Sequence, residues 1–230
     1  MDTPRTGKHI SQQYNDELEE IKTHLLTMGG LVEQQLEKAT RALVEGDSAL
    51  SNEVYKEGRR VNELEKLIDE ESAQCLARRQ PAAGDLRLIV TVIKAVSDIE
   101  RVGDQAERLA RFAAQLTEHP RPKNNYHEVY RLAQHVQKMF HDALDAFARG
   151  DEKLALSVIN EDVNVDHEYE GIMRQHITYM MEDPRSINSS LDVLWAIRAL
   201  ERIGDHACNL CEYLVYLVKG QDIRHTSKPE

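Results

Sequence analysis

The sequence predicts an all-α protein of two tandem three-helix bundles, six long helices in all, that are related by internal duplication. Apolar residues recur at intervals of three and four over long stretches, which is the spacing of one helix face. Aromatic residues make up 5% of the 230 residues and charged residues 30%, a composition typical of helical rather than sheet proteins. The second half of the chain repeats the order of helices and turns found in the first half.

Three helices are predicted in the first half. An apolar stripe runs from Ile10 to Leu43 and ends at the Gly-Asp pair 46–47, where the glycine stops one helix and the aspartate caps the next. A second stripe covers residues 50–76. The proline-containing stretch 78–85 ends it, and a third stripe follows over residues 88–113.

The second half restarts the same pattern. The fourth helix is predicted over Tyr126–Arg149 and ends at a second Gly-Asp pair, 150–151. The fifth extends from Glu152 to about Glu182, where "EDPRS" (182–186) breaks the periodicity as the earlier proline does. The sixth extends from Ile187 to about Lys219.

A polar stretch separates the two halves. "EHPRPKNN", residues 118–125, has two prolines and no large apolar side chain, which indicates a linker or corner. We therefore expect a first bundle over residues 1–119, a linker over 120–125, a second bundle over 126–220 and a polar tail over 221–230.

Composition limits the classes of function. A net charge of -11 argues against direct binding of nucleic acid, which needs concentrated Lys and Arg. The chain has no run of about 20 apolar residues and no apolar signal core at its start, so a cytoplasmic location is expected. Cys75, Cys208 and Cys211 are interpreted as small buried hydrophobes rather than disulfide partners.

The clearest internal repeat lies in the third and sixth helices. "DIERVGDQA" (98–106) and "ALERIGDHA" (199–207) align with an offset of 101 residues, and six of twelve residues from Ile99 and Leu200 are identical. In each copy an acid pair spaced by one helical turn accompanies a glycine, although glycine costs about 1 kcal/mol in a helix. The acid pairs are Glu100 with Asp104 and Glu201 with Asp205.

Two interpretations of these acid pairs stay open. Carboxylates one turn apart on one face repel each other, and a bound cation would relieve that repulsion. The alternative is a solvated acidic stripe in which Arg101 and Arg202 form ordinary ion pairs. Small residues at positions 103 and 204 would let a neighbouring backbone or an ion come close.

The second and fifth helices carry further acids that could complete a metal site. Glu63 or Glu65 could face the third helix, and Asp166 and Glu170 could face the sixth. The alternative is an ordinary charged helix surface.

Catalytic motifs are lacking. The chain has no Glu-x-x-His pair for a di-iron bundle, no P-loop, no nucleophile elbow and no dinucleotide fingerprint. Cys208 and Cys211 would lie about 300° apart around a helix, which favours packing over zinc binding. The sequence therefore does not predict an enzyme. The helical histidines are expected at the surface or on helix flanks: His24, His135, His141, His167 and His176.

The repeated motifs, together with "AAGDLR" (82–87) and "YMMEDPRSI" (179–187), resemble the PhoU family from about Ile10 to Gly220. The resemblance implies two three-helix bundles related by a pseudo-two-fold axis, a cytoplasmic location and a homodimer. It also implies a negative regulator of the phosphate-starvation response. Such an adaptor would couple the phosphate ABC transporter, including its ATPase subunit, to a membrane sensor histidine kinase, and would meet the membrane through these partners alone.

The resemblance extends to metal binding. Some PhoU-like proteins bind iron or other divalent ions through paired acidic motifs, and by position the ligands here are Glu100, Asp104, Glu201 and Asp205. Iron, manganese, zinc or magnesium are the candidate ions. A carboxylate bundle with a metal-storage or hydrolytic role is therefore the alternative function, and an architectural coiled-coil dimer is a third.

Overall fold

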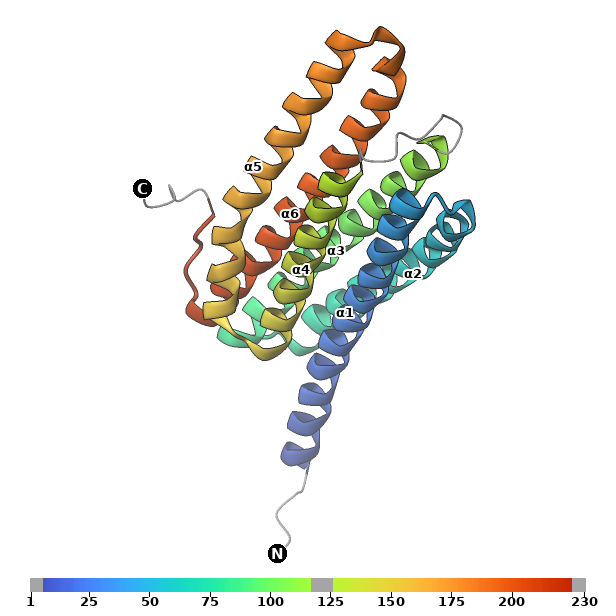
Figure 1. Ribbon diagram of the computed structural model, residues 1–230. Coiled ribbons are helices and arrows are strands. Elements are labelled where there is room, and N and C mark those ends of the chain that lie inside the picture. The colour runs from blue at the N-terminus through green and yellow to red at the C-terminus, as the bar shows by residue number, and fades with distance from the viewer. Residues whose placement is uncertain (1–5, 117–125, 225–230) are drawn as a thin grey trace, which may run out of the picture.

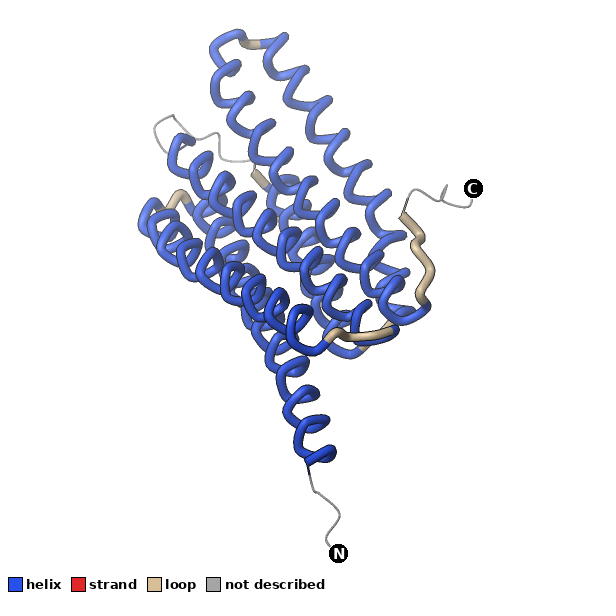
Figure 2. Tube along the Cα trace, turned by 180° about the vertical axis from the view of Figure 1, so that it is seen from behind, coloured by secondary structure: helices blue, strands red, loops and turns tan. Residues whose placement is uncertain are grey.

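The computed structural model describes residues 6–116 and 126–224, with side chains from residue 12 onward. The expected linker at 120–125 and the end of the expected polar tail lie outside these residues. Within them the chain is almost entirely helical and contains no strand (Figures 1 and 2), which confirms the predicted all-α class. The elements are α1 (Thr6–Glu45), α2 (Ser48–Arg79), α3 (Ala83–Leu116), α4 (His127–Arg149), α5 (Glu152–Glu182), the 3-10 helix η1 (Pro184–Ser186) and α6 (Ile187–Lys219).

The two Gly-Asp turns form as predicted. Gly46 and Gly150 have φ of +75° and +66°, a left-handed conformation that glycine adopts without steric cost. Asp47 then accepts a hydrogen bond from the Ala49 amide at 2.8 Å, and Asp151 accepts one from the Leu154 amide at 3.1 Å. Each side-chain cap contributes about 1 kcal/mol to the helix that it begins.

Helix α3 begins earlier than the apolar stripe predicts. It starts at Ala83, inside the stretch 78–85 that the sequence suggested as a break. Asp85 lies in the first turn, where a negative charge faces the positive end of the helix dipole. The break itself is confined to the residues around Pro81, with Gln80 and Ala83 both at a φ of 48°.

The six helices form two groups of three that lie side by side. Helices α1, α2 and α3 contact one another, and so do α4, α5 and α6. The groups meet through contacts of α3 with α6 and of α1 with α4 (Figure 1). The N-terminal part of α1 extends past the other helices at one end of the molecule, and the α5–α6 hairpin extends past α4 at the other.

One continuous hydrophobic core runs through both groups. Burial of each large side chain stabilises the fold by about 1.5–3 kcal/mol. The largest fully buried side chains come from five of the helices: Leu25, Met28, Leu36, Leu43, Ile68, Ile89, Ile99, Leu109, Leu116, Leu132, Phe140 and Ile197. The central position of α3 and α6 sets where the repeated motifs lie.

The structure also shows where the three cysteines and His176 lie. Cys75, Cys208 and Cys211 are buried and free, as predicted. The surface placement of His176 was wrong, because this side chain is 2% exposed and stacks edge-on against Tyr179. No helix in the described ranges has the length and apolarity that a membrane span requires.

Candidate functional site

The repeated motifs lie near the middle of α3 and α6, the two helices that join the bundles. Glu100 and Glu201 are half-buried, and Asp104 and Asp205 are exposed. Each motif therefore presents two carboxylates at the edge of the core, one turn apart.

The two motif glycines differ in their surroundings. A Cβ atom at Gly103 would lie 3.2 Å from Gln35 Oε1 and 3.5 Å from a methyl group of Val32, both on α1. A Cβ atom at Gly204 would lie 3.5 Å from a methyl group of Val165 on α5, an ordinary van der Waals distance. Side chains of α1 thus pack tightly against Gly103, whereas Gly204 has ordinary contacts, and at neither glycine are the nearest atoms those of the neighbouring backbone that the sequence suggested.

Four acids gather along α2 and α3, and we call them the α3 cluster: Glu65, Glu100, Asp104 and Glu107. Burial raises the pKa of Glu100, and the charges of Asp104 and Glu65 raise it further. Burial and Asp104 also raise the pKa of Glu107, and burial, Asp69 and Asp104 raise that of Glu65. These carboxylates therefore repel one another in a partly desolvated setting.

A second group lies along α5 and α6, the α6 cluster: Asp162, Asp166, Glu201 and Asp205. Burial raises the pKa of Glu201, and Asp205 and Asp166 add to the effect while Arg198 opposes it. Burial and then Asp162 are the main causes that raise the pKa of Asp205.

Glu201 is the most constrained member of the α6 cluster. Its side chain is 13% exposed, and its Oε1 atom accepts a hydrogen bond from Arg198 Nη1 at 2.8 Å. Its Oε2 atom is buried and has no hydrogen-bond partner. A buried carboxylate oxygen that lacks a partner is costly, and a cation or an added proton would satisfy it.

The structure distinguishes among the acids that the sequence suggested as additional ligands. Asp166 lies near the α6 pair, since its charge acts on both Glu201 and Asp205. Glu170 is 56% exposed and pairs with Arg174 at 3.8 Å. Glu63 is exposed, and its neighbour Glu65 is the α2 acid whose charge reaches Glu100.

Asp162 was not expected in the α6 cluster, and Glu107, although it was expected on the same face as Glu100 and Asp104, was not suggested as a ligand. Asp162 precedes Asp166 by four residues, and Glu107 follows Glu100 by seven, so each shares a helix face with a residue already singled out. This spacing along the helix is the sequence feature that indicates both residues as members of the clusters.

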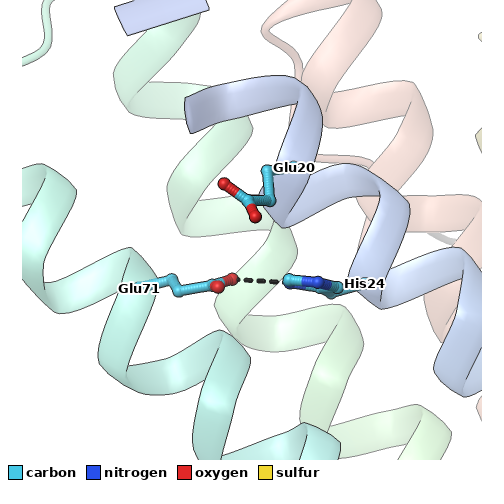
Figure 3. Close-up of side chains that lie close together, drawn as sticks. All are labelled: Glu20, His24 and Glu71. Atoms are coloured by element: carbon cyan, nitrogen blue, oxygen red, sulfur yellow. Dashed lines mark hydrogen bonds and ion pairs between the residues drawn. The ribbon is translucent and has the colours of Figure 1, made fainter. Parts of the chain in front are cut away.

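The donor chemistry of both clusters fits a hard divalent cation, because carboxylate oxygens are its preferred ligands. In the described part of the chain, however, neither cluster brings three ligand atoms within 4.8 Å of one another. The group that meets this distance lies elsewhere, between α1 and α2 (Figure 3).

The cysteine pair of α6 packs in the core. Cys211 is fully buried, and burial raises the pKa of its thiol to about 12. Cys208 is 9% exposed. A thiol that stays protonated is a poor zinc ligand, which favours the packing interpretation.

A buried polar network between the bundles was not foreseen. Asp98 of α3 accepts hydrogen bonds from Asn209 Nδ2 at 3.1 Å and Tyr213 OH at 2.8 Å, and it pairs with His206 Nδ1 at 2.7 Å. Burial raises the pKa of Asp98, but these three partners lower it by more, so the net shift is downward. The partners are over 100 residues away in the chain, so helical periodicity gives no sign of them.

Known proteins with this pattern were found by sequence and by structure. The family model described as "PhoU domain" matches residues 25–113 and 129–214. The "Phosphate-specific transport system accessory protein PhoU homolog" of Pseudomonas putida is 54% identical over 217 residues, which covers 94% of this chain and 85% of that protein.

Two solved structures have the same fold. The crystal structure of PhoU from Pseudomonas aeruginosa superposes with a TM-score of 0.88 and 51% identity, covering 90% of this chain and 100% of that one. The phosphate transport system regulatory protein PhoU from Streptococcus pneumoniae gives a TM-score of 0.83 and 29% identity, covering 91% and 98%.

Proposed function

Because this chain belongs to the PhoU family, we propose that it is a cytoplasmic adaptor that keeps the phosphate-starvation response off when phosphate is plentiful. It would couple the phosphate ABC transporter, through the ATPase subunit, to a membrane sensor histidine kinase. The observation that carries the proposal is similarity over 94% of the chain to an accessory protein of phosphate-specific transport. In this role the protein binds other proteins as a homodimer and catalyses no reaction.

Exposed apolar side chains support a protein-binding role. On α6, Ile187, Leu191 and Trp195 are spaced by four residues and are 40%, 41% and 58% exposed. On α5, Met181 is 79% exposed. All four belong to the α5–α6 hairpin that extends past α4 (Figure 1), and we call them the hairpin patch. Exposed apolar side chains that share one helix face, as Ile187, Leu191 and Trp195 do, are available for binding another protein.

The direct test is deletion of the gene. We expect phosphate-starvation genes to be expressed constitutively in the deletion strain and to be repressed again when the chain is supplied in trans. Normal repression without the protein would refute the adaptor role. If light scattering then still gave a dimer, the architectural alternative would be favoured.

A second candidate function is binding of divalent ions by the two acidic clusters, and the partnerless Oε2 atom of Glu201 favours it. Glu100 and Asp104 would hold one ion and Glu201 and Asp205 another, with iron, manganese, zinc or magnesium as candidates. A bound ion would neutralise the mutual repulsion of the carboxylates.

Elemental analysis of protein purified without chelator tests the metal proposal. The double variant Glu201→Ala with Asp205→Ala is expected to lose bound metal while its circular dichroism stays helical. Glu63→Ala with Glu170→Ala removes as many charges from exposed positions and is expected to keep the metal. Equal metal content in both variants would refute the assignment.

A further inference from the structure

A mixed histidine and carboxylate cluster lies between α1 and α2, away from both acidic clusters. Glu20 and His24 lie one turn apart on α1, and Glu71 faces them from α2 (Figure 3). One ligand atom from each of the three side chains lies within 4.8 Å of the other two. We propose that Glu20, His24 and Glu71 bind one divalent transition-metal ion.

The distances suit shared coordination. His24 Nδ1 lies 2.9 Å from Glu71 Oε2. Two ligands of one ion, each about 2.1 Å from it, are about 3.0–3.4 Å apart, so small side-chain rotations make room for a metal between them. Glu20 then supplies a second carboxylate from the same helix face as His24.

The ligand types select the class of metal. One imidazole nitrogen with two carboxylate oxygens suits zinc, manganese or iron, whereas magnesium prefers an all-oxygen shell. Three protein ligands leave at least one coordination position for water or for a group from a partner.

The surroundings allow an ion to enter and to stay. The side chains of His24 and Glu71 are 26% and 25% exposed, and Glu20 and Glu71 line a cavity of about 170 Å³. Two arginines are close. Arg79 is already paired with Glu17 through two hydrogen bonds of 2.9 and 2.5 Å, and Arg78 is exposed at the rim of the cavity. The cluster thus keeps two carboxylates for one cation.

An ion here would connect two helices. The site lies toward the N-terminal part of α1, which extends past the rest of the molecule (Figure 1), next to the Glu17–Arg79 pair. Binding would therefore stabilise the attachment of α1 to α2 and raise the unfolding temperature as the free ion concentration increases relative to the dissociation constant.

A second histidine provides a matched control. His135 of α4 contacts Glu161 through Nε2 at 3.0 Å and Glu168 through Nδ1 at 3.3 Å. Its two carboxylates lie on opposite ring nitrogens, so they cannot share one ion with a single nitrogen. Both clusters consist of one histidine and two glutamates. Only the cluster between α1 and α2 has its ligand atoms arranged so that they can bind the same ion.

The experiment is a Zn²⁺ titration of the chelator-stripped full-length protein, followed through the histidine ring resonances by NMR. The resonance lost in His24→Gln identifies His24. We expect stoichiometric Zn²⁺ to shift or broaden this resonance, and Mg²⁺ to leave it unchanged. Because the acidic clusters contain no histidine, this signal reports on the proposed site even if they also bind metal.

Variants make the outcome decisive. Glu20→Gln, at an exposed position that leaves the fold intact, is expected to weaken the Zn²⁺ response of His24 by about tenfold or more, while His135→Gln leaves it unchanged. A His24 resonance whose chemical shift and line width do not change during the Zn²⁺ titration would overturn the proposal. So would a response that survives both Glu20→Gln and Glu71→Gln, because Zn²⁺ binding at His24 would then not depend on either carboxylate. Neither result bears on the adaptor role.

Discussion

Asp98 Oδ1 lies 2.7 Å from His206 Nδ1, and this buried pair connects α3 to α6 across the junction of the two bundles. The internal repeat has no second copy of it. The residues that correspond to Asp98 and His206 after the offset of 101 are Ala199 and Gln105. The duplicated halves therefore diverged at the positions where they meet.

Replacing Asp98 with alanine is expected to lower the free energy of unfolding by about 3 kcal/mol. The carboxylate is 5% exposed, and its loss leaves the buried His206 and the partly buried Asn209 and Tyr213 without their shared acceptor. Urea denaturation followed by circular dichroism measures the change.

The exposed Asp16→Ala is the control and should change the free energy of unfolding by less than about 0.5 kcal/mol. The pH dependence gives a second check. Because the native pKa of Asp98 is lowered, its stabilising contribution is present above its ordinary value of 3.8 and is lost as the pH falls through the native pKa. Equal stability of Asp98→Ala and Asp16→Ala would contradict the role of the network.

The acidic clusters predict the opposite pH dependence. The native pKa of Glu201 is raised above its ordinary value of 4.5, so the protonated form is favoured by folding. Its stabilising effect is present below 4.5 and is lost as the pH rises through the native pKa. Glu201→Gln, which stays neutral, is therefore expected to flatten the fall in stability as the pH rises above 4.5 and through the native pKa of Glu201.

Thermal unfolding of metal-free protein at several pH values measures this slope. Glu170→Gln, at an exposed position paired with Arg174, should retain the wild-type slope. A Glu201→Gln protein whose melting temperature follows the wild-type pH curve would show that the α6 cluster does not destabilise the fold.

The two motif glycines are expected to respond differently to alanine. Gly204→Ala gains up to about 1 kcal/mol of helix propensity, because the added methyl group meets Val165 at an ordinary 3.5 Å. Gly103→Ala places it 3.2 Å from Gln35 Oε1. Gln35 cannot easily move, since it is fully buried and its Nε2 donates to Val54 O at 3.0 Å. We expect this variant to lose about 1 kcal/mol or more.

Parallel urea titrations of the two variants decide the point. Similar free energies of unfolding would mean that the side chain of Gln35 adapts, and the glycine at position 103 would then need another explanation.

The sequence was informative wherever structure is local. Both Gly-Asp turns follow from one residue's φ preference and the next residue's side-chain cap, so Gly46, Asp47 and their second copies could be recognised from their order alone. The six helices followed from apolar spacing for the same reason. The start of α3 did not, because no side chain of its first turn is buried and Asp85 there faces the helix dipole.

Contacts between helices were the part that sequence could not supply. Periodicity predicts the helix face on which Glu100 lies. It does not predict which acid of α2 is the neighbour of Glu100, and the structure shows that it is Glu65 rather than Glu63. His176 was misplaced because a histidine counts as polar, although it follows the buried Ile172 by one turn. Glu20 and His24 are spaced one residue more widely than a Glu-x-x-His pair, and Glu71 comes from another helix, so no motif in the sequence indicates this cluster.

The hairpin patch yields a prediction about partner binding. Trp195 is 58% exposed, so Trp195→Ser should change the free energy of unfolding by less than about 0.5 kcal/mol. If the patch contacts a partner, loss of its largest aromatic side chain is expected to weaken that contact at least tenfold, since tryptophan is enriched among residues that dominate interface energy. Pull-down with the two proposed partners, the transporter ATPase subunit and the cytoplasmic part of the sensor kinase, measures the effect, and light scattering of each variant follows the proposed homodimer.

Val218→Ser is the matched control, because Val218 is 46% exposed near the other end of the same helix, α6. It removes a similar apolar contact without touching the hairpin patch. Loss of partner capture by Trp195→Ser but not by Val218→Ser places a partner at the hairpin. Loss of the dimer by Trp195→Ser alone would instead assign the hairpin patch to self-association. Unchanged capture and unchanged mass would exclude the patch from both roles, and the adaptor would then have to use another helix face.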